Sequence, residues 1–303
     1  VYMGDDQRFE YIYKFVSKNR YQPGNRAANM RLLEEGTLYA ARFNENGSGD
    51  WLALVHGQNG LTAANGFADQ GEVLVKTRMA ADLVGATKMD RPEWITADPF
   101  TAGSIYCTLT NNSQRGEAGK PAADAANPRA NNLFGHIIHW QEADGDGTKL
   151  SFKWDILVLA GNKQAAKSEH KGNINGDDFG SPDGLAFDSR GVLWIQTDVS
   201  TSTLNMKEYA GMGNNQMVAT VLGSNEYRRF LTAPNGSEVT GIAFTPDNKT
   251  MFINIQHPGE PSKGDSDPAR PTAVSTWPDG AAAGRPRAAT VVITKNDGGV
   301  IGS

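Results

Sequence analysis

The sequence predicts an all-β fold, a β-propeller in which about 3.75 four-stranded blades are visible, with a small helical insertion. Composition supports this fold, because 34 of the 303 residues are glycine and 14 are proline, as is typical of many short strands joined by turns. Repetition supports it too. Segments 181–198 and 238–257 each contain an apolar strand, a polar turn and a second strand that ends in polar residues.

A weaker third copy of this hairpin occupies residues 93–112. Two further strands are expected after each copy, at residues 136–140, 152–158, 216–222, 227–231, 275–277 and 290–293. Each copy and its two following strands form a unit of four antiparallel strands, and such units in series are typical of a propeller. The chain start fits the same template without its first strand, with strands expected at 1–3, 9–16 and 38–43.

The one convincing helix lies between blades, around residues 71–85, where small and apolar residues recur on one face at helical spacing. Residues 261–288, with several Pro, Gly, Ala and Asp, are interpreted as a surface excursion. Fewer than four full blades cannot close a propeller. We therefore expect residues 1–303 to form a single propeller domain that is truncated at its N-terminus.

Charge and motifs exclude several classes of function. The chain has 29 Lys and Arg against 34 Asp and Glu, a net charge of −5, which disfavours nucleic-acid binding. No apolar run reaches the roughly 18 residues of a membrane span. A single cysteine, Cys107, excludes an internal disulfide and a thiolate zinc cluster, and its place within a strand predicts a core residue. Serine-hydrolase and nucleotide-binding motifs are missing. We expect a monomer.

The repeat places polar residues at one end of the channel. In a propeller the start of strand one and the end of strand two of each blade lie at the same face. Glu93, Asp183 and Glu238 stand at equivalent places, each at the start of a strand one. The strand-two ends carry Asp5, Asp6, Asn111, Asn112, Asp198 and His257. We expect all of these side chains to gather at one mouth of the channel.

Carboxylates that converge repel one another, so their pKa values rise unless a partner compensates the charge. A hard cation is the usual partner, and sites rich in carboxylate and amide oxygens suit Ca²⁺. One histidine nearby also allows a transition metal. Any single acid here can be a plain turn residue or strand cap, but three at equivalent repeat positions favour a metal cluster.

Six short motifs occur between residue 1 and about residue 260. They are Tyr2-Met3-Gly4-Asp5-Asp6, Arg91-Pro92-Glu93-Trp94, Asn127-Pro128-Arg129 with Gly135-His136-Ile137, Ser181-Pro182-Asp183-Gly184, Glu238-Val239-Thr240-Gly241 and Asn254-Ile255-Gln256-His257-Pro258-Gly259-Glu260. Each motif alone is weak. Together and in this order they resemble the PhoX family of bacterial alkaline phosphatases.

The resemblance implies a phosphomonoesterase that the Tat pathway exports to the periplasm or beyond, on a six-bladed propeller, acting on small phosphate esters through iron and calcium ions. By motif, Glu93 and Glu238 resemble the carboxylates that hold the metal cluster, and Trp94 resembles a wall of the phosphate pocket. Asp183 resembles a calcium ligand. Asp5 and Asp6 are further metal candidates, and Arg129, Asn111 and His257 are candidates for substrate binding.

Two departures from the family pattern concern the site. The family carries a cysteine iron ligand in an upstream Thr-Cys-Glu-Glu-Asn segment, which this chain lacks. The family's phosphate-binding arginine precedes the second glutamate, but residues 234–238 contain no arginine, so either Arg129 or Arg270 serves instead or the site is altered. We therefore expect that this chain can be inactive on its own.

Two other functions fit the same residues. The segment 182–188 also resembles lactonase-type propellers, in which one calcium suffices, so a calcium-dependent lactonase-like hydrolase is an alternative. A non-catalytic propeller that uses calcium for stability and one face for binding is another. Iron together with calcium favours the phosphatase. Calcium alone favours the other two, and turnover of a lactone separates them.

Overall fold

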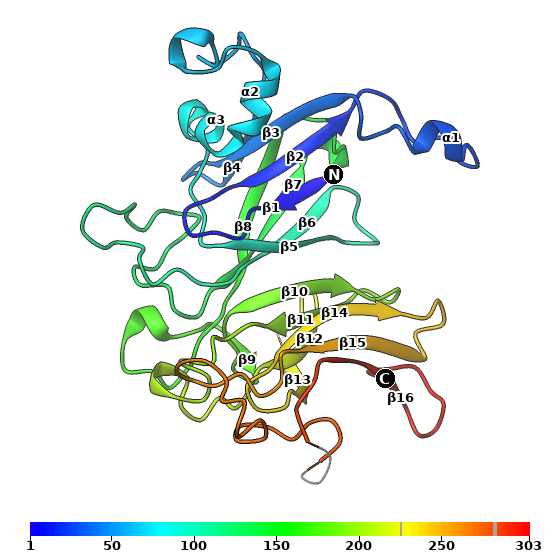
Figure 1. Cartoon of the computed structure of the whole chain (residues 1–303). Coiled ribbons are helices and arrows are strands. Elements are labelled where there is room, and N and C mark those ends of the chain that lie inside the picture. Colours follow the sequence, from blue (N-terminus) through cyan, green and yellow to red (C-terminus); the bar gives the residue numbers. More distant parts are fainter. Residues whose placement is uncertain (225, 281–283) are drawn as a thin grey trace.

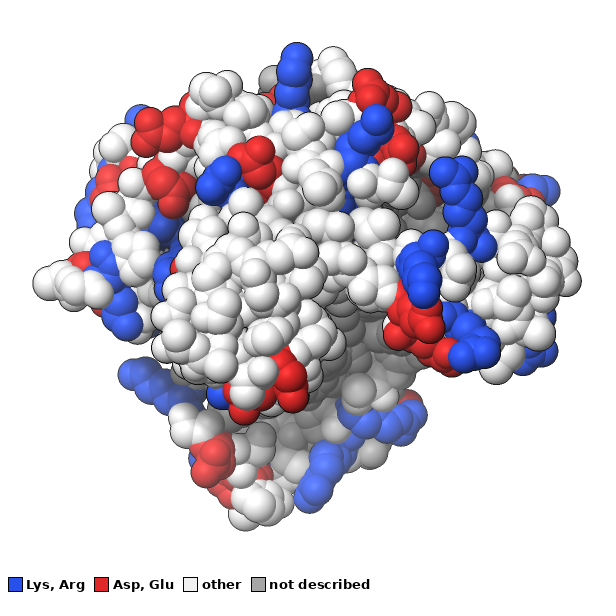
Figure 2. All heavy atoms as spheres, turned by 90° about the horizontal axis from the view of Figure 1, so that it is seen from above, with Lys and Arg blue, Asp and Glu red and all other residues white. Residues whose placement is uncertain are grey.

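The computed structural model describes residues 1–224, 226–280 and 284–303. Within them the fold is mainly β, as predicted, with strands arranged in sheets of eight, five and three. Figure 1 shows β1–β8 in one half of the molecule and β9–β16 in the other. On the face seen in Figure 2, acidic and basic side chains are interspersed and the surface is hollowed near its centre.

The largest sheet is an antiparallel sheet of eight strands in the order β1-β2-β3-β4-β8-β7-β6-β5. In chain order these are β1 (Tyr2–Gly4), β2 (Ile12–Ser17), β3 (Gly36–Phe43), β4 (Ser48–Ala53), β5 (Pro92–Ala97), β6 (Ser104–Leu109), β7 (His136–Glu142) and β8 (Ser151–Leu159). The first and last strands of this order approach each other closely. A Cβ atom at Gly4 would lie 2.5 Å from the carbonyl oxygen of Pro92, so only glycine fits there and the sheet is nearly closed.

The second sheet contains four consecutive antiparallel strands plus one short parallel strand. They are β10 (Pro182–Phe187), β11 (Val192–Thr197), β12 (Gln216–Val221), β13 (Glu226–Thr232) and, beside β13, β9 (Asn175–Gly176). The third sheet is an antiparallel meander of β14 (Glu238–Phe244), β15 (Thr250–Gln256) and β16 (Ala289–Thr294).

The predicted count of about 3.75 separate four-stranded blades is not confirmed. The sequence analysis missed β4, which pairs with β8 and so joins two predicted blades into one sheet. It also missed β9. The strand expected at 275–277 is wrong, because residues 275 and 276 are irregular and residue 277 begins a turn that contains Pro278, a residue disfavoured within sheets.

The helices lie at the edge of the eight-stranded half (Figure 1). They are α1 (Arg26–Asn29), α2 (Gln70–Val75) and α3 (Thr77–Val84), with short 3-10 turns at Ala63–Asn65, Ala143–Gly145, Ser168–His170 and Lys207–Tyr209. Asp69 caps α2, accepting a hydrogen bond from the Glu72 amide at 2.9 Å, and Gly85 ends α3 in the left-handed region. None of the described helices has the length and apolar character required to cross a membrane.

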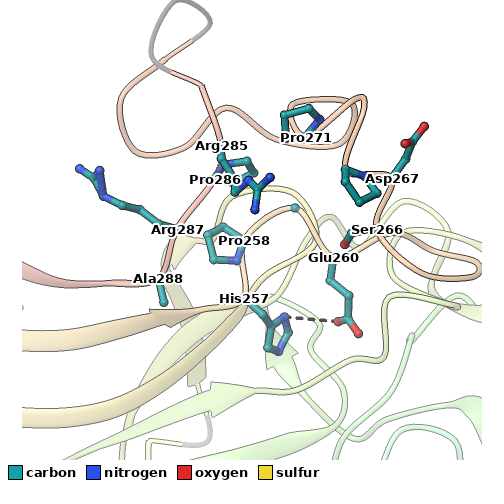
Figure 3. A pocket seen from close by; sticks show the side chains of 12 residues that line it. His257, Pro258, Glu260, Ser266, Asp267, Pro271, Arg285, Pro286, Arg287 and Ala288 are labelled. Atoms are coloured by element: carbon teal, nitrogen blue, oxygen red, sulfur yellow. Dashed lines mark ion pairs between the residues drawn. The ribbon is translucent and has the colours of Figure 1, made fainter.

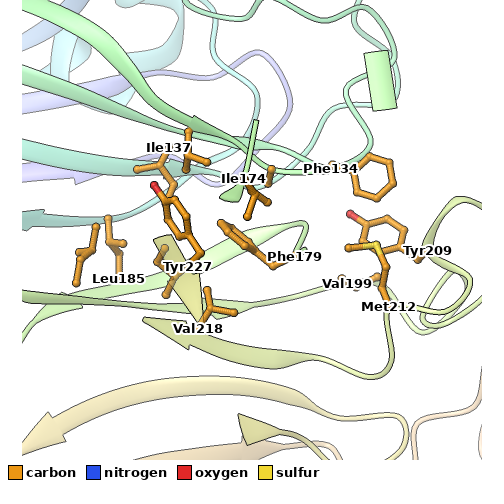
Figure 4. Packing of buried hydrophobic residues seen from close by; sticks show 14 of the residues in the cluster. Phe134, Ile137, Ile174, Phe179, Leu185, Val199, Tyr209, Met212, Val218 and Tyr227 are labelled. Atoms are coloured by element: carbon orange, nitrogen blue, oxygen red, sulfur yellow. The ribbon is translucent and has the colours of Figure 1, made fainter. Parts of the chain in front are cut away.

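Hydrophobic packing joins the sheets into one body. One cluster fills the eight-stranded sheet, a second lies between that sheet and the helices, and a third lies between the second and third sheets. The cluster in Figure 4 joins the first sheet to the second. Its labelled members are Phe134, Ile137, Ile174, Phe179, Leu185, Val199, Tyr209, Met212, Val218 and Tyr227. This packing fixes β5 and β10 next to each other.

A buried ion pair lies among the aromatic side chains of the eight-stranded sheet. Lys14 Nζ is 3.1 Å from Glu142 Oε2, and both side chains are almost fully buried. The carboxylate of Glu142 also accepts hydrogen bonds from the Tyr2 hydroxyl, at 2.8 Å, and from the Trp51 indole, at 3.1 Å. Because every oxygen of the buried carboxylate has a donor, the pair is accommodated without an unpaired charge.

A second buried ion pair fixes the long loop after β6. Asp90, just before β5, accepts a hydrogen bond from Arg115 Nε at 2.6 Å, and neither side chain is exposed to solvent. The Asn112 and Asn132 amides donate to the same carboxylate, each at 2.9 Å. The loop is therefore attached to the start of β5, directly beside Arg91.

His136, the first residue of β7, gives folding a pH dependence. Its Nε2 donates to the carbonyl of Ala126 at 2.8 Å, and Asn132 faces Nδ1 at 3.3 Å. Burial, reinforced by the charge of Arg129, lowers the pKa of His136 to about 3 from its usual 6.5. The stability that depends on neutral His136 is therefore present above pH 6.5 and decreases as the pH falls toward 3, because only the unfolded chain takes up the proton.

We expect the wild type to lose about 2 kcal/mol more unfolding free energy than His136→Gln between pH 7 and pH 5, since one group contributes at most about 1.4 kcal/mol per pH unit. Urea unfolding at both pH values measures this difference. His139→Gln is the matched control on the same strand, because His139 is partly exposed and pairs with Asp155. Equal losses in wild type and His136→Gln would contradict the prediction.

Candidate functional site

The three acids predicted at strand starts come together at one end of the molecule. Glu93 is the second residue of β5, Asp183 the second of β10 and Glu238 the first of β14. Strand β10 packs beside both β5 and β14. The charge of Asp183 acts on Glu93, and that of Glu238 acts on Asp183, so the three carboxylates lie within electrostatic range as one cluster.

A β-bulge occurs at the acid in two of these strands and close to it in the third. The pairing shifts between Pro92 and Ile95 in β5, between Pro182 and Leu185 in β10, and between Thr240 and Ile242 in β14. A bulge bends its strand and redirects the side chains beside it, and bulges are frequent next to active sites. The three bulges thus turn the strand starts toward a common point.

The bulges correct the predicted equivalence of the three acids. Glu93 and Asp183 each stand two residues before the residue at which the strand pairing resumes, and Thr240 holds this place in β14. Glu238 stands two residues earlier, paired with Gln256. Gln256 Nε2 donates to Glu238 Oε2 at 2.9 Å, which holds the carboxylate at the strand end. Glu238 therefore reaches the cluster from a different place in the repeat.

The cluster has too little positive charge beside it to keep all of its carboxylates ionised. Burial raises the pKa of Glu93 to about 9, and a hydrogen bond with Asp6 and the charge of Asp183 add to the rise. Burial likewise raises the pKa of Asp183 to about 8, with contributions from Asp198 and Glu238. Burial and Asp198 raise the pKa of Glu238 to about 7, against the opposing effect of His257. Each shift has the same physical cause, which is a carboxylate out of water beside other carboxylates.

Arg91 is the cation that the sequence analysis missed at this cluster. Its guanidinium forms a two-bond ion pair with Asp6, at 2.8 and 3.1 Å, and Nη2 lies 3.9 Å from Glu93 Oε1. The residue has a positive φ of 58°, which is uncommon for a side chain of this size. Strain of this kind is concentrated at functional sites. Arg91 belongs to the motif Arg91-Pro92-Glu93-Trp94, but nothing in the sequence indicated that it would pair with Asp6.

The structure separates the two neighbouring aspartates after β1. Asp6 joins the cluster, and its pKa is lowered because the hydrogen bond with Glu93 and the Arg91 ion pair outweigh burial. Asp5 instead forms an ion pair with Arg78 on α3, with Nη2 at 2.5 Å from Oδ1 and Nε at 2.8 Å from Oδ2. Asp5 thus attaches the helices to the sheet and is engaged away from the cluster.

The other predicted residues lie at different distances from the cluster. His257 lies at the edge of the cluster, with Nε2 3.5 Å from Glu238 Oε2. Asp198 directly follows β11, and its charge raises the pKa of Asp183. Asn111 donates to the hydroxyl of Ser181 at 3.2 Å, and Ser181 lies two residues before Asp183 in the chain. Trp94 follows Glu93 in the bulge of β5 and packs against the core shown in Figure 4.

Two predicted residues are engaged elsewhere. The buried guanidinium of Arg129 donates to the carbonyl of Ala160 at 2.7 Å and to the carbonyl of Gly135, so its hydrogen bonds hold the backbone together. Arg270 forms an ion pair with Asp267 in the excursion. Cys107 is fully buried on β6, and burial raises the pKa of its thiol. It is a core residue, as predicted, and an inert one.

Two side chains that sequence reasoning missed hold neighbouring sheets in register at the bulges. Thr108 on β6 donates to the carbonyl of Asp183 at 2.6 Å, and Gln196 on β11 donates to the carbonyl of Gly241 at 3.2 Å. Both occupy the penultimate position of a strand two. Each ties its own unit to the bulge of the next, which fixes the spacing between the acids.

The chemistry of the clustered carboxylates suits a hard cation, but their arrangement does not yet form an ion site. Buried carboxylates with raised pKa values, mostly lacking a cation, are the arrangement that Ca²⁺ compensates. Among residues 1–224, 226–280 and 284–303, however, no three His, Cys, Asp or Glu side chains are already arranged to hold an ion. The cluster contains candidate oxygen ligands, which would have to draw closer to hold an ion.

Comparison with known proteins places the chain in a family. The model of the family "Alkaline phosphatase PhoX" matches residues 1–259. This chain belongs to the PhoX family. A solved structure of Pseudomonas fluorescens PhoX in complex with vanadate, a transition state analogue, matches with a TM-score of 0.89 and 46% sequence identity. The match covers 99% of this chain and 51% of that PhoX chain. No curated protein matches the sequence.

Proposed function

We propose that this protein is a metal-dependent phosphomonoesterase, a phosphoric monoester hydrolase acting on small phosphate esters. Membership of the PhoX family, together with a relative that binds a transition state analogue, supports the phosphatase class. The observation that carries the assignment of the site is the cluster of Glu93, Asp183 and Glu238 at three bulged strand starts. Because the chain spans about half of the solved relative, the activity of the whole protein belongs to this proposal.

The cluster would hold calcium and iron. We assign Glu93, Asp183, Glu238 and Asp6 as candidate ligands, and a metal cluster bound there would supply Lewis-acid stabilisation of the charge on the phosphate. Arg91 balances part of the carboxylate charge and offers a second cation toward a phosphate. Trp94 forms a wall beside Glu93, and His257 and Asn111 line the edge of the site. Arg129 has its hydrogen bonds committed to backbone carbonyls, so we leave it out.

The rest of the proposal concerns the whole protein. We propose a six-bladed propeller to which residues 1–303 contribute a single domain, working as a monomer in the periplasm or outside the cell. It would bind small phosphate esters, and neither nucleic acid nor membranes. The family pattern, the net charge of −5 and the mainly β sheets support these expectations.

The test combines metal content with turnover. Because residues 1–303 can be inactive on their own, the sample is the purified whole protein. Elemental mass spectrometry is expected to find iron together with calcium in it, and the same sample is expected to hydrolyse 4-nitrophenyl phosphate until a chelator removes the metals. Calcium without iron, together with no hydrolysis, would contradict the proposal. That result would favour a lactonase-like hydrolase or a non-catalytic propeller, and a lactone assay on the same sample would then separate these two.

A further inference from the structure

A cavity of about 470 Å³ adjoins the acidic cluster. His257 and Glu260 form its floor, and His257 Nδ1 lies 3.3 Å from Glu260 Oε2 (Figure 3). The same histidine faces Glu238 through Nε2 at 3.5 Å. The cavity therefore opens from the edge of the proposed phosphate site and shares one of its residues.

The walls of this cavity are partly apolar and come from residues 257–260 and from the excursion of residues 261–288. Four proline rings contribute to them: Pro258, Pro268, Pro271 and Pro286. Proline rings carry no N–H donor, so such walls suit an apolar body that makes few hydrogen bonds. The cavity thus has the character of a binding site for the carbon part of a ligand.

One cation points into this cavity without a carboxylate partner. Figure 3 shows the guanidinium of Arg285 directed into the space between the prolines, and that of Arg287 directed away from it. Arg287 is engaged with Asp279, at 2.9 Å, and Asp267 with Arg270, at 2.9 Å. In the part of the chain that the structure describes, no ion pair engages Arg285. Its charge is available to a ligand.

We propose that this cavity binds the leaving group of the phosphomonoester, and that Arg285 pairs with an anionic group on it. The inference rests on the proposed function, because the phosphate of the ester has to lie at the adjacent acidic cluster. The prolines contact the carbon skeleton, and Arg285 selects esters whose leaving group carries a negative charge. Esters with a neutral leaving group gain only the apolar contact.

The test uses two pairs of compounds, and the members of each pair differ by one carboxylate group. Phenylphosphonate and 3-carboxyphenylphosphonate are not hydrolysed, so isothermal titration calorimetry gives their dissociation constants without turnover. Phenyl phosphate and 3-carboxyphenyl phosphate are the matching substrates. Wild type, Arg285→Gln and the control Arg287→Gln are compared with each pair.

We expect the carboxylate to improve the affinity of the phosphonate about 3- to 5-fold in wild type and Arg287→Gln, as an exposed ion pair would, and to give no gain in Arg285→Gln. The kcat/KM for 3-carboxyphenyl phosphate should likewise exceed that for phenyl phosphate in wild type and Arg287→Gln, and this advantage should be missing in Arg285→Gln. A gain that is missing in wild type, or equal in Arg285→Gln, overturns the proposal. An Arg285-dependent gain in affinity without hydrolysis of either phosphate supports the cavity and counts against the phosphatase function instead.

Discussion

Replacing Glu93 by glutamine is expected to lower kcat/KM for a phosphomonoester on the order of 100-fold and to reduce the metal retained by the purified protein. Glutamine keeps the shape of the side chain but loses the negative charge that a cation needs. Glu93 is mostly buried in the bulge of β5, next to Asp6 and Arg91, so its replacement removes a carboxylate from within the proposed site. Steady-state kinetics and elemental analysis of one preparation measure both effects.

The same variant is expected to fold normally. In the metal-free protein at pH 8, burial opposes ionisation of Glu93, and glutamine removes that cost, so the urea midpoint in a chelator should stay equal or rise. Glu226→Gln on β13 is the matched control, because Glu226 forms an exposed ion pair with Arg228 and should keep both metal and activity. Unchanged kinetics and metal content in Glu93→Gln would remove Glu93 from the site.

Replacing Arg115 by methionine is expected to reduce the unfolding free energy by about 3–5 kcal/mol. The substitution leaves the carboxylate of Asp90 fully buried with only two amide donors, and an unpaired buried charge is costly. Denaturant unfolding at neutral pH measures the loss. Since Asp90 directly precedes Arg91, the damage should also reach the site and lower metal retention.

Arg31→Met is the matched control for this prediction. Arg31 pairs with Glu34 at 2.8 Å, but its side chain is 75% exposed, so its replacement should leave the unfolding free energy nearly unchanged. The double variant Asp90→Leu with Arg115→Met should recover part of the stability, because apolar replacement of both partners removes the unpaired charge. A loss below about 1 kcal/mol in Arg115→Met would show that the pair is not a structural requirement.

The sequence predicted the hairpins from short-range patterns, and it predicted the meeting of the acids because the hairpins repeat. Alternating apolar residues defined β10, β11, β14 and β15, and the repeat placed Glu93, Asp183 and Glu238 at the same end of successive units. The glycines at 184 and 241 were a usable signal for the bulges, since an isolated glycine within a strand often marks one. A Cβ at Gly184 would press against the side chain of Gln196, with the Cβ of Gln196 only 3.0 Å away, so glycine leaves room for Gln196 at the bulge.

Long-range contacts could not be predicted in the same way. Strand β4 begins with Ser48, Gly49 and Asp50, residues of low strand propensity, and is stabilised by β8 far along the chain. Arg91 reaches Asp6 only because β1 and β5 become neighbours when the sheet closes. Arg129 was assigned to substrate by motif, whereas its burial against backbone carbonyls depends on the packed loop around it.

The pairing of β4 with β8 also determines how long β4 stays unpaired while the chain is being synthesised. Ser48 pairs with Lys153, which is 153 − 48 = 105 residues later. At about 5–20 residues per second, the ribosome needs roughly 5–20 s to deliver that partner. During this interval β1–β4 present an open strand edge, and an open edge can pair with another nascent chain. Ser48, Gly49 and Asp50 form strands weakly and so reduce that hazard. The residues that made β4 hard to predict thus also protect the growing polypeptide from pairing with another chain.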